Sequence, residues 1–447
     1  MVTRQLAEFV CLTRYEDIPQ EVVEQSKLVF LDWLGVTLCG ANEPLAGILL
    51  ELLGELDGPL GPSQATVIGK GLKTDVLKAA LANGCLSHAL DLDDYHGAIL
   101  AHPTVTLLPG ILAVAEWKRM SGKDVITALV VGFEVLATIG RAAGRIHYDR
   151  GWHATSTLGR FGAAAAVAKL LGLEEERVIN ALGIAGTQAG GVRQVFGTMC
   201  KPFHAGKASM DGVLSALLAA KGFTSSKQII EGKHGFLDVF SSGSGFEAAI
   251  GDLGKIYHIL GVSFKPYASC AFTHSTIDLM RRVRNKIRGD FSGVEEVRVE
   301  VNRGALDAAG NPAPRTGLEA KFSLWYCAAV ALKDGEVGID KFSEEKVADP
   351  QVLELMRKIR VVPVSDQELH LGARVAVRMR DGSVHEESTP SPRGAPQNPL
   401  SYDELVEKFT SLASQVLTNA RARELAETIR SLERVKDVSS LVSMTCP

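Results

Sequence analysis

Several common features are scarce or missing in this 447-residue sequence, and each absence excludes a class of protein. Aromatic residues make up 6% of the chain, and the formal net charge is −4 at pH 7. A basic footprint for nucleic acid is therefore absent at the level of the whole chain. The seven cysteines include no C-x-x-C pair. This removes zinc-knuckle and dithiol redox motifs and favours a reduced, cytoplasmic protein.

Long apolar runs and nucleotide-binding motifs are also missing. No stretch reaches the roughly 18 charge-free apolar residues that a membrane span needs. The best candidate, residues 125–140, carries Glu134 in its middle, and the N-terminus places Arg4 and Glu8 among apolar residues, as an amphipathic helix does. The chain contains no G-x-x-x-x-G-K-[ST], G-x-S-x-G or H-E-x-x-H motif. We expect neither membrane attachment nor a nucleotide site.

What is present is an ordinary globular composition with strong helical periodicity. Hydrophobic residues make up 46% and charged residues 22% of the chain, and its length favours two domains. One short run, 65–68, reads as a strand, and the small-residue segment 161–171 predicts a buried central helix. Apolar periodicity predicts helices at about 20–38, 44–54, 74–90, 104–119, 123–143, 154–171, 174–187 and 207–222.

The pattern changes after residue 264. Alternation predicts a strand at 295–302 and a hairpin at 374–387 around Asp381-Gly382, followed by a proline-rich linker at 389–399. Helices are predicted at about 273–287, 319–333, 344–358, 402–418 and 420–433. The predicted fold class is mainly α. A large all-helical domain comprises residues 1–264 plus 400–447, and a smaller inserted α+β domain comprises 265–399.

The densest polar cluster is ALDLDDYHGAILAHP at 89–103. Carboxylates this close repel one another, so at least one should have a raised pKa or a cationic partner. Three interpretations are open for this segment. It could be a solvated loop after a helix, a Mg²⁺, Mn²⁺ or Fe²⁺ site, or an acid–base loop in which an aspartate orients His102.

Two further segments place cations or hydrogen-bond donors at predicted helix starts. GWHATSTLGRFG at 151–162 sets His153 and Thr155 at a helix N-terminus, which attracts anions; a simple helix cap explains the same residues. GTMCKPFHAGKASMDG at 197–212 places Lys201, His204 and Lys207 near another helix start. Cations are disfavoured there unless an anion compensates them, and exposed lysines are the plain alternative.

A fourth segment, FKPYASCAFTHSTID at 264–278, holds Cys270 and His274 four residues apart. A Cys–His nucleophilic pair is conceivable at this spacing. Because no oxyanion motif accompanies it, a buried structural cysteine and a capping histidine are favoured.

These segments, in this order, resemble the MmgE/PrpD family. The motifs are D-x-D-D…H-P, G-[FW]-H-x-T-x-T-x-G-x-F-G-A-A-A-A, G-T-M-x-K-P-x-H-A-G and E-A-K-F-S-L-x-Y at 319–326, and together they cover nearly the whole chain. The resemblance implies a large helical domain with an α+β lid, a homodimer, and a small di- or tricarboxylate substrate bound in a cleft between the domains. It also implies chemistry without a metal or cofactor.

The resemblance also carries over site residues. Tyr95 stands where relatives often have threonine. The catalytic positions it implies are Asp91, His102, His153, Lys201 and Tyr326, and the substrate-binding positions are Tyr95, Thr155, His204, Lys207 and His274. We expect His102, oriented by Asp91, to move protons, Lys201 and His153 to bind carboxylates, and Tyr326 to donate from the lid.

The implied reaction breaks a C–H bond or loses CO₂ next to a carboxylate. Either step builds negative charge that preorganised cations stabilise. Dehydration of a 2-methylcitrate-like hydroxy acid is favoured over decarboxylation of a cis-aconitate-like acid. An isomerase or epimerase of an iminodisuccinate-like substrate needs the same C–H abstraction, and a helical scaffold without catalysis is the non-enzymatic alternative.

Overall fold

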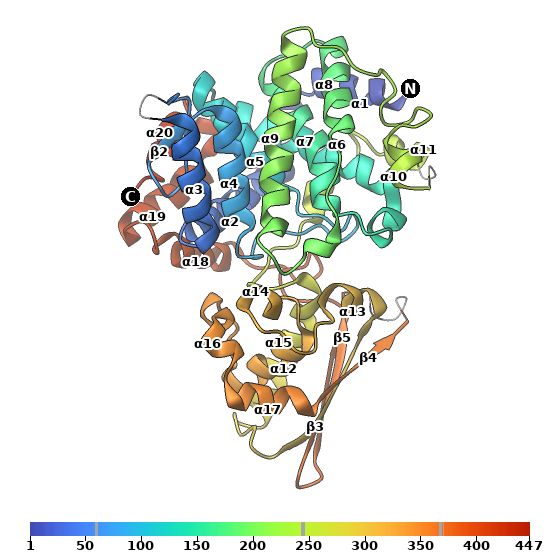
Figure 1. Cartoon of the computed structure of the whole chain (residues 1–447), viewed down its shortest axis with the longest axis vertical. Helices are drawn as coiled ribbons and strands as arrows, with labels where there is room; N and C mark the ends of the chain where they lie inside the picture. The colour runs from blue at the N-terminus through green and yellow to red at the C-terminus, as the bar shows by residue number, and fades with distance from the viewer. Residues whose placement is uncertain (59–60, 243–245, 366–368, 370) are drawn as a thin grey trace.

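The apolar-periodic segments form helices that pack into the larger of two lobes (Figure 1). The structure is a computed structural model, and it describes residues 1–58, 61–242, 246–365, 369 and 371–447. A short hairpin, β1 (Ala65–Val67) and β2 (Leu72–Thr74), also belongs to this helical lobe. Its helices are α1 (Val2–Leu12), α2 (Gln20–Gly40), α3 (Pro44–Asp57), α4 (Val76–His88), α5 (Thr104–Lys118), α6 (Gly122–Asp149), α7 (Ala154–Leu170), α8 (Glu175–Thr187), α9 (Cys200–Ala220), α10 (Phe236–Phe240), α11 (Phe246–Gly251), α18 (Tyr402–Ala413), α19 (Asn419–Arg430) and α20 (Ser439–Ser443).

Small residues allow α7 to lie at the centre of the helical lobe. Every residue from 154 to 168 is buried. A Cβ added at Gly162 would lie 2.8 Å from the carbonyl oxygen of Gly132 on α6, and one at Gly212 on α9 would lie 2.3 Å from the Cβ of Ala163. These helices approach so closely because they have no side chain at the crossing. The predicted buried central helix is confirmed.

Helix α9 begins at Cys200, seven residues before the predicted start. Pro202 falls in its first turn, where a missing N–H costs nothing because that group would have no partner within the helix. Lys201 and His204 are therefore three residues apart on one helical face rather than in a preceding loop. A Cβ at Gly206 would lie 2.2 Å from the carbonyl oxygen of Leu81, so α9 also packs closely against α4.

Helix α6 is long and apolar enough to cross a membrane, but 94% of its most apolar window is buried inside the protein. The pair α2 and α3 passes the same test only across an 80° bend. Glu134, in the middle of α6, accepts hydrogen bonds from the backbone N–H groups of His258 (2.9 Å) and Ile259 (3.1 Å). Burial raises its pKa to about 7. The apolar surface of α6 is thus used by the core of the lobe.

The smaller lobe carries a four-stranded sheet with the strand order β4-β3-β5-β6. Strands β3 and β4 are parallel, and the other neighbours are antiparallel. Its elements are α12 (Ala271–Lys286), β3 (Val294–Asn302), α13 (Arg303–Ala309), α14 (Gly317–Ala320), α15 (Leu324–Asp334), α16 (Glu344–Val347), α17 (Pro350–Lys358), β4 (Ile359–Val364), β5 (Ala373–Met379) and β6 (Val384–Thr389). The predicted strand and hairpin are confirmed. Strand β4 was not predicted because Pro363 interrupts its pattern, and it lies at the sheet edge, where proline is tolerated.

Helices α12, α15 and α17 pack against this sheet (Figure 1). Val297, Val299 and Val301 point into the resulting core, while the residues between them are more exposed. The same core includes Leu90 and Leu412 from the helical lobe. After β6 the chain returns to the helical lobe, where α18 packs on α2 and the C-terminus lies. The molecule is therefore mainly α, with the four-stranded sheet in the smaller lobe and the short β1–β2 hairpin in the helical lobe.

Candidate active site

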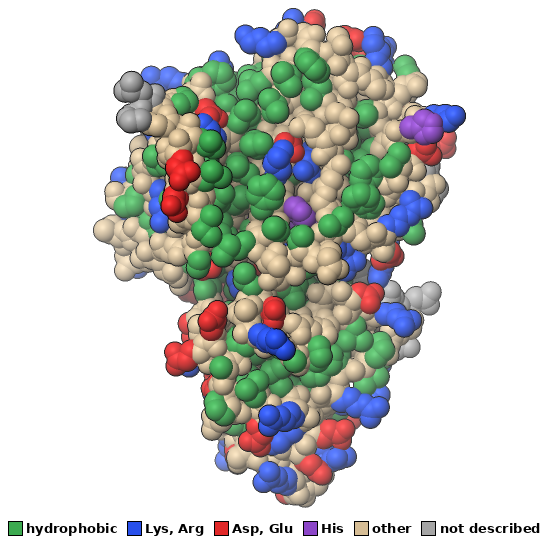
Figure 2. Space-filling view, viewed as in Figure 1, with side chains coloured by type: hydrophobic (Ala, Val, Ile, Leu, Met, Phe, Trp, Pro, Cys, Tyr) green, Lys and Arg blue, Asp and Glu red, His purple; other side chains and the backbone are tan. Residues whose placement is uncertain are grey.

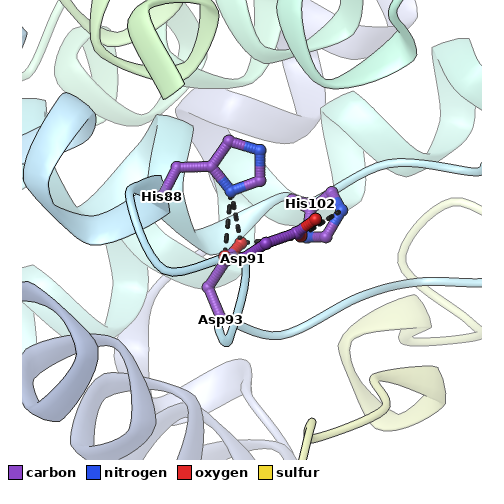
Figure 3. A group of neighbouring side chains, drawn as sticks. All are labelled: His88, Asp91, Asp93 and His102. Atoms are coloured by element: carbon purple, nitrogen blue, oxygen red, sulfur yellow. Dashed lines mark hydrogen bonds and ion pairs between the residues drawn. The ribbon is translucent and has the colours of Figure 1, made fainter. Parts of the chain in front are cut away.

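The end of α4 and the segment between α4 and α5 carry the four side chains drawn in Figure 3. Asp93 lies between two imidazoles: its Oδ1 is 2.9 Å from Nδ1 of His88, and its Oδ2 is 2.9 Å from Nδ1 of His102. All three side chains are buried. Asp93 therefore fixes the orientation of both rings and leaves their Nε2 atoms for other partners. The interpretation of this segment as a solvated loop is wrong.

Asp91 forms ion pairs with two lysines from distant parts of the chain. Its Oδ1 lies 2.6 Å from Nζ of Lys265, in the segment that enters the smaller lobe, and 3.0 Å from Nζ of Lys201 on α9. Nε2 of His102 is 3.9 Å from the same oxygen. Burial alone would raise the pKa of Asp91, but the charges of Lys201 and Lys265 outweigh it and hold that pKa well below its usual range. Asp91 is a carboxylate at neutral pH.

The backbone around Asp91 is held by further lysines. Asp91 has φ of 52°, in the left-handed region that non-glycine residues seldom adopt. The ammonium groups of Lys321, Lys265 and Lys408 donate to the carbonyl oxygens of residues 90, 91 and 92 at 2.9, 2.9 and 2.8 Å, respectively. Three consecutive charge-assisted hydrogen bonds offset the backbone strain. Each comes from a different part of the chain, so the site forms only when both lobes are in place.

A second imidazole pair forms the side of the site. His153 precedes α7, and its Nδ1 lies 2.9 Å from Nδ1 of His204 on α9. Burial, together with the charge of Lys201, lowers the pKa of His153 well below its ordinary value. Burial also lowers the pKa of His204 to about 4. Both rings are thus neutral at neutral pH, and one donates to the other. The ring of Phe196 meets His153 edge-on at 4.9 Å between centroids.

These groups enclose a narrow cavity between the lobes. Its open volume is about 30 Å³, which is room for about two water molecules. The phenylalanines Phe196, Phe272 and Phe322 form an aromatic wall of the cavity, and the ammonium of Lys201 lies 5.6 Å from the centroid of Phe196 and 5.3 Å from that of Phe322. The lining residues are Asp91, Tyr95, Leu100, His102, Tyr148, His153, Phe196, Lys201, Lys265, Cys270, Ala271, Phe272 and Phe322. The cavity as it stands is too small for a tricarboxylate.

The charges in the cavity balance before any substrate binds. Burial lowers the pKa of His102 to about 4, against the attraction of Asp93 and with the repulsion of Lys265. Burial would lower the pKa of Lys265, but Asp91 and Asp93 outweigh it and raise that pKa. Two lysine cations therefore face two aspartate anions across neutral imidazoles. A bound polyanion would add negative charge beside His102, raise its pKa and favour its protonation.

The four residues of Figure 3 were also considered as a metal site. One ligand atom from each of His88, Asp91, Asp93 and His102 lies within 4.8 Å of the others. However, Oδ1 of Asp91 already contacts two ammonium groups, and a divalent cation beside it would meet both positive charges. The two lysines beside Asp91 therefore disfavour a divalent cation at these four side chains and favour an anion that binds to the lysines themselves.

The structure brings five of the predicted site residues to the cavity: Asp91, Tyr95, His102, His153 and Lys201. The Tyr95 hydroxyl is buried and has no hydrogen-bond partner among the described residues, so it is available to a ligand. Thr155 and His204 contact residues that line the cavity but do not line it themselves. The Thr155 hydroxyl accepts the backbone N–H of His102 at 3.0 Å, and His204 contacts His153. These two residues therefore position site residues.

Three predicted residues lie elsewhere. Tyr326, the expected donor from the lid, is fully buried in the core of the smaller lobe, and its hydroxyl donates to the carbonyl of Lys341. The expected role is wrong because Tyr326 lies on the face of α15 that points into this core. His274 is buried behind the cavity, with Nε2 3.2 Å from the carbonyl oxygen of Ser269. Lys207 pairs with Asp211 on its own helix. The Cys270–His274 nucleophilic pair is not formed.

Sequence reasoning missed Lys265 and the aromatic wall. A signal for Lys265 existed, because both cavity lysines precede a proline, in Lys201-Pro202 and Lys265-Pro266. Lys265 stands in the fourth polar segment, where Cys270 and His274 drew attention instead. Phe196 and Phe322 lie 5.7 Å apart between centroids although 126 positions separate them in the sequence, and no local pattern reveals such a contact.

This fold and site define a two-lobed, mainly α protein with a buried centre of lysines, aspartates and imidazoles. Residues 4–249 match the MmgE/PrpD N-terminal domain, and residues 267–434 match the MmgE/PrpD C-terminal domain. The chain therefore belongs to the MmgE/PrpD family. The second match includes α18 and α19, which pack with the helical lobe in the structure.

Named relatives cover almost the whole chain. Cis-aconitate decarboxylase of Aspergillus terreus is 30% identical over 100% of this chain and 96% of its own length. Cis-aconitate decarboxylase of Homo sapiens is 27% identical over 99% of this chain and 94% of its own length. A 2-methylcitrate dehydratase of Salmonella typhi is 25% identical over 94% of this chain and 92% of its own length.

Proposed function

We propose that this protein is a lyase that removes CO₂ from a small unsaturated tricarboxylate such as cis-aconitate. The observation that carries the proposal is the convergence of Lys201 and Lys265 beside His102 in a cavity that phenylalanine rings also line. The full-length similarity to cis-aconitate decarboxylases supports it. Decarboxylation needs cations for the carboxylates that stay, an apolar surface for the one that leaves, and a proton donor.

In the proposed mechanism the substrate carboxylates bind Lys201 and Lys265, competing with Asp91. The added negative charge raises the pKa of His102, which takes up a proton from solvent. Loss of CO₂ leaves its bonding electron pair conjugated with a remaining carboxylate, where the lysine cations stabilise it. The imidazolium of His102 then donates its proton to a carbon of the carbanion that the loss of CO₂ leaves. The balance is one substrate trianion plus one proton giving one product dianion plus CO₂.

The aromatic wall contributes to the same step. A carboxylate held against Phe272 loses its hydration, and a charged group without hydrogen bonds is disfavoured in an apolar environment. Departure as neutral CO₂ relieves that cost. The Tyr95 hydroxyl, which has no partner among the described residues, would bind another carboxylate oxygen and fix which end of the substrate faces the wall.

Dehydration of a 2-methylcitrate-like hydroxy acid is the second candidate. The neutral state of His102 before substrate binds favours it, because a neutral imidazole can take the proton from a C–H bond while a lysine protonates the leaving hydroxyl. Relatives named 2-methylcitrate dehydratase, at 24–25% identity, are consistent with it. Epimerisation of an iminodisuccinate-like acid begins with the same abstraction and returns the proton to the opposite face.

We further propose that residues 265–399 act as an inserted lid domain over the helical domain of residues 1–264 and 400–447. The small cavity supports this, because a tricarboxylate enters only if the lobes separate. Two segments connect the lobes, 261–266 and 389–399, and their bending would open the site. Lys265 lies in the first segment, so closure would also complete the cation pair around Asp91.

A homodimer is proposed as the working form. Helix α3 exposes Ile48, Leu52 and Leu56, four residues apart, at 59%, 47% and 63% exposure, and Figure 2 shows hydrophobic side chains gathered on this face of the helical lobe. Continuous exposed apolar patches are typical of protein interfaces. Sedimentation of the protein and of a Leu52→Glu variant tests this: a dimer that dissociates in the variant supports the proposal, and a wild-type monomer contradicts it.

Turnover of a substrate panel tests the activity. The purified protein is incubated with cis-aconitate, citrate, 2-methylcitrate and iminodisuccinate, with and without EDTA, and products are identified by NMR. Release of CO₂ from cis-aconitate, unaffected by EDTA and lowered about 10²–10⁴-fold in His102→Gln, is the expected result. Water loss from 2-methylcitrate without CO₂ release would support the second candidate. Solvent deuterium in recovered substrate would indicate epimerisation.

A further inference from the structure

A second cavity lies directly behind the candidate active site. Its open volume is about 130 Å³, compared with about 30 Å³ for the catalytic cavity. Leu100 and Tyr148 line both cavities, so their side chains form the wall between them. A larger space therefore adjoins the catalytic cavity across this wall.

The lining of the second cavity is mostly apolar, with Arg145, His147 and Tyr148 as its polar members. Ile99 and Leu158 are buried on its lining, and Gly140 adds no side chain. Helix α6 departs from helical geometry at Gly144, where φ is 65° and ψ is 178°, and a Cβ added there would meet nothing within 4 Å. The kink therefore leaves the outer part of the cavity open. Arg145 lies beside the opening.

The two side chains of the wall differ in how firmly they are held. The guanidinium of Arg193 lies 3.8 Å from the centroid of the Tyr148 ring and donates to the Tyr148 carbonyl oxygen at 3.1 Å. These contacts fix Tyr148. Leu100 has φ of 52°, which is strained for a residue with a branched side chain, and it is only half-buried. Leu100 is therefore the part of the wall that can move aside, and strained residues cluster at ligand-binding sites.

We propose that the second cavity is a subsite for an alkyl substituent of the substrate and that Leu100 is the specificity-determining residue that admits it. The substrate class is then a small polycarboxylate carrying an apolar chain, with its carboxylates on Lys201 and Lys265 and its chain past Leu100. This inference rests on the proposed function for the placement of the carboxylates. It goes further by naming the part of the substrate that distinguishes it from an unsubstituted tricarboxylate.

Binding of 2-alkylsuccinates of increasing chain length tests the subsite independently of turnover. Methyl, propyl and pentyl derivatives are titrated calorimetrically into the full-length protein. Each methylene buried in an apolar cavity should tighten binding about fourfold. The cost of moving Leu100 is common to all chains that pass it, so it leaves this increment unchanged.

Ala98 offers a variant that fills the subsite without touching the catalytic cavity, because it is exposed and lines the second cavity alone. Ala98→Phe should abolish the gain with chain length while leaving the affinity for methylsuccinate unchanged. Ala420→Phe, at an exposed position on α19, is the matched control and should behave as wild type. Affinity that does not rise with chain length in the wild type, or a rise that persists in Ala98→Phe, would overturn the proposal.

The readouts separate this inference from the proposed function. A chain-length dependence that Ala98→Phe removes, together with no CO₂ release from cis-aconitate or its alkyl derivatives, would support the subsite and contradict the decarboxylase. Decarboxylation of cis-aconitate with no dependence on chain length would support the decarboxylase and overturn the subsite.

Discussion

Replacement of Lys265 by methionine tests the electrostatic account of the site most severely. Lys265 is 1% exposed, and its ammonium donates to Asp91 Oδ1 (2.6 Å), the Asp91 carbonyl (2.9 Å) and the Ser269 carbonyl (3.2 Å). Methionine preserves the length and apolar stem of the side chain and removes the charge and all three hydrogen bonds. Asp91 keeps Lys201 at 3.0 Å as its remaining cationic partner.

The size of the effect follows from these contacts. Breaking a buried ion pair costs about 3–5 kcal/mol of stability, and the lower end applies here because Lys201 still compensates Asp91. Removing one preorganised group that faces developing charge lowers kcat by about 10²–10³-fold. The pKa of Asp91 should rise, because one of the two cations that lower it is gone. Activity in the variant should therefore fall more steeply than in the wild type as the pH is lowered.

The assay combines CO₂ release from cis-aconitate with urea unfolding, each across pH 5 to 8. Lys70→Met, at an exposed lysine in the turn between β1 and β2, is the matched control and should resemble the wild type in both measurements. A Lys265→Met enzyme with kcat within threefold of the wild type would refute the assignment of Lys265 to charge stabilisation. Loss of stability with unchanged kcat would reduce Lys265 to a structural role.

Further predictions follow from neighbouring contacts. Tyr326→Phe removes one hydrogen bond to the Lys341 carbonyl, so the free energy of unfolding should fall by about 1 kcal/mol while kcat and KM stay unchanged. A selective fall in kcat would show that Tyr326 acts in catalysis. Gly84→Ala should destabilise the fold by at least about 1–3 kcal/mol, because its Cβ would lie 2.5 Å from the Cα of Gly206; unchanged urea unfolding would contradict this packing. The pKa of His102 is lowered to about 4 in the folded protein, so on acidification the unfolded chain takes up a proton at this residue before the folded protein does. The contribution of neutral His102 to stability is therefore present above about pH 6.5 and is lost as the pH falls towards 4. His102→Gln should therefore lose about 2 kcal/mol less stability than the wild type between pH 7 and 5, and equal losses would refute the lowered pKa.

Local patterns predicted most of the helices because a helix is specified by residues three and four positions apart. The helices α4 and α7 were predicted on this basis, and the β5–β6 hairpin was predicted from alternation around Asp381-Gly382; the structure has all three. The start of α9 was placed too late because Lys201 and Pro202 read as loop residues, although proline is accepted in a first turn. Strand β4 escaped prediction because Pro363 interrupts its pattern and because its partner, β3, is distant in the sequence.

The site was predictable only in part, for the same reason. Asp91, His102, His153 and Lys201 stand in segments whose composition is unusual for a helical protein, and all four line the cavity. The hydrogen bonds from Lys265, Lys321 and Lys408 to the loop at 90–92 join residues more than 170 positions apart, and no local pattern encodes them. Tyr326 shows the opposite error, since a motif marked it but the orientation of its helix buries it.

The most direct test of the central claim is NMR of cis-aconitate incubated with the protein in D₂O. The account predicts one CO₂ and one deuteron on carbon in each five-carbon dicarboxylate product, because His102 delivers a solvent-derived proton to the carbanion that the loss of CO₂ leaves. Recovered cis-aconitate should carry no deuterium. Cis-aconitate that stays intact, adds water, or exchanges deuterium without losing CO₂ would contradict the decarboxylase proposed for this site.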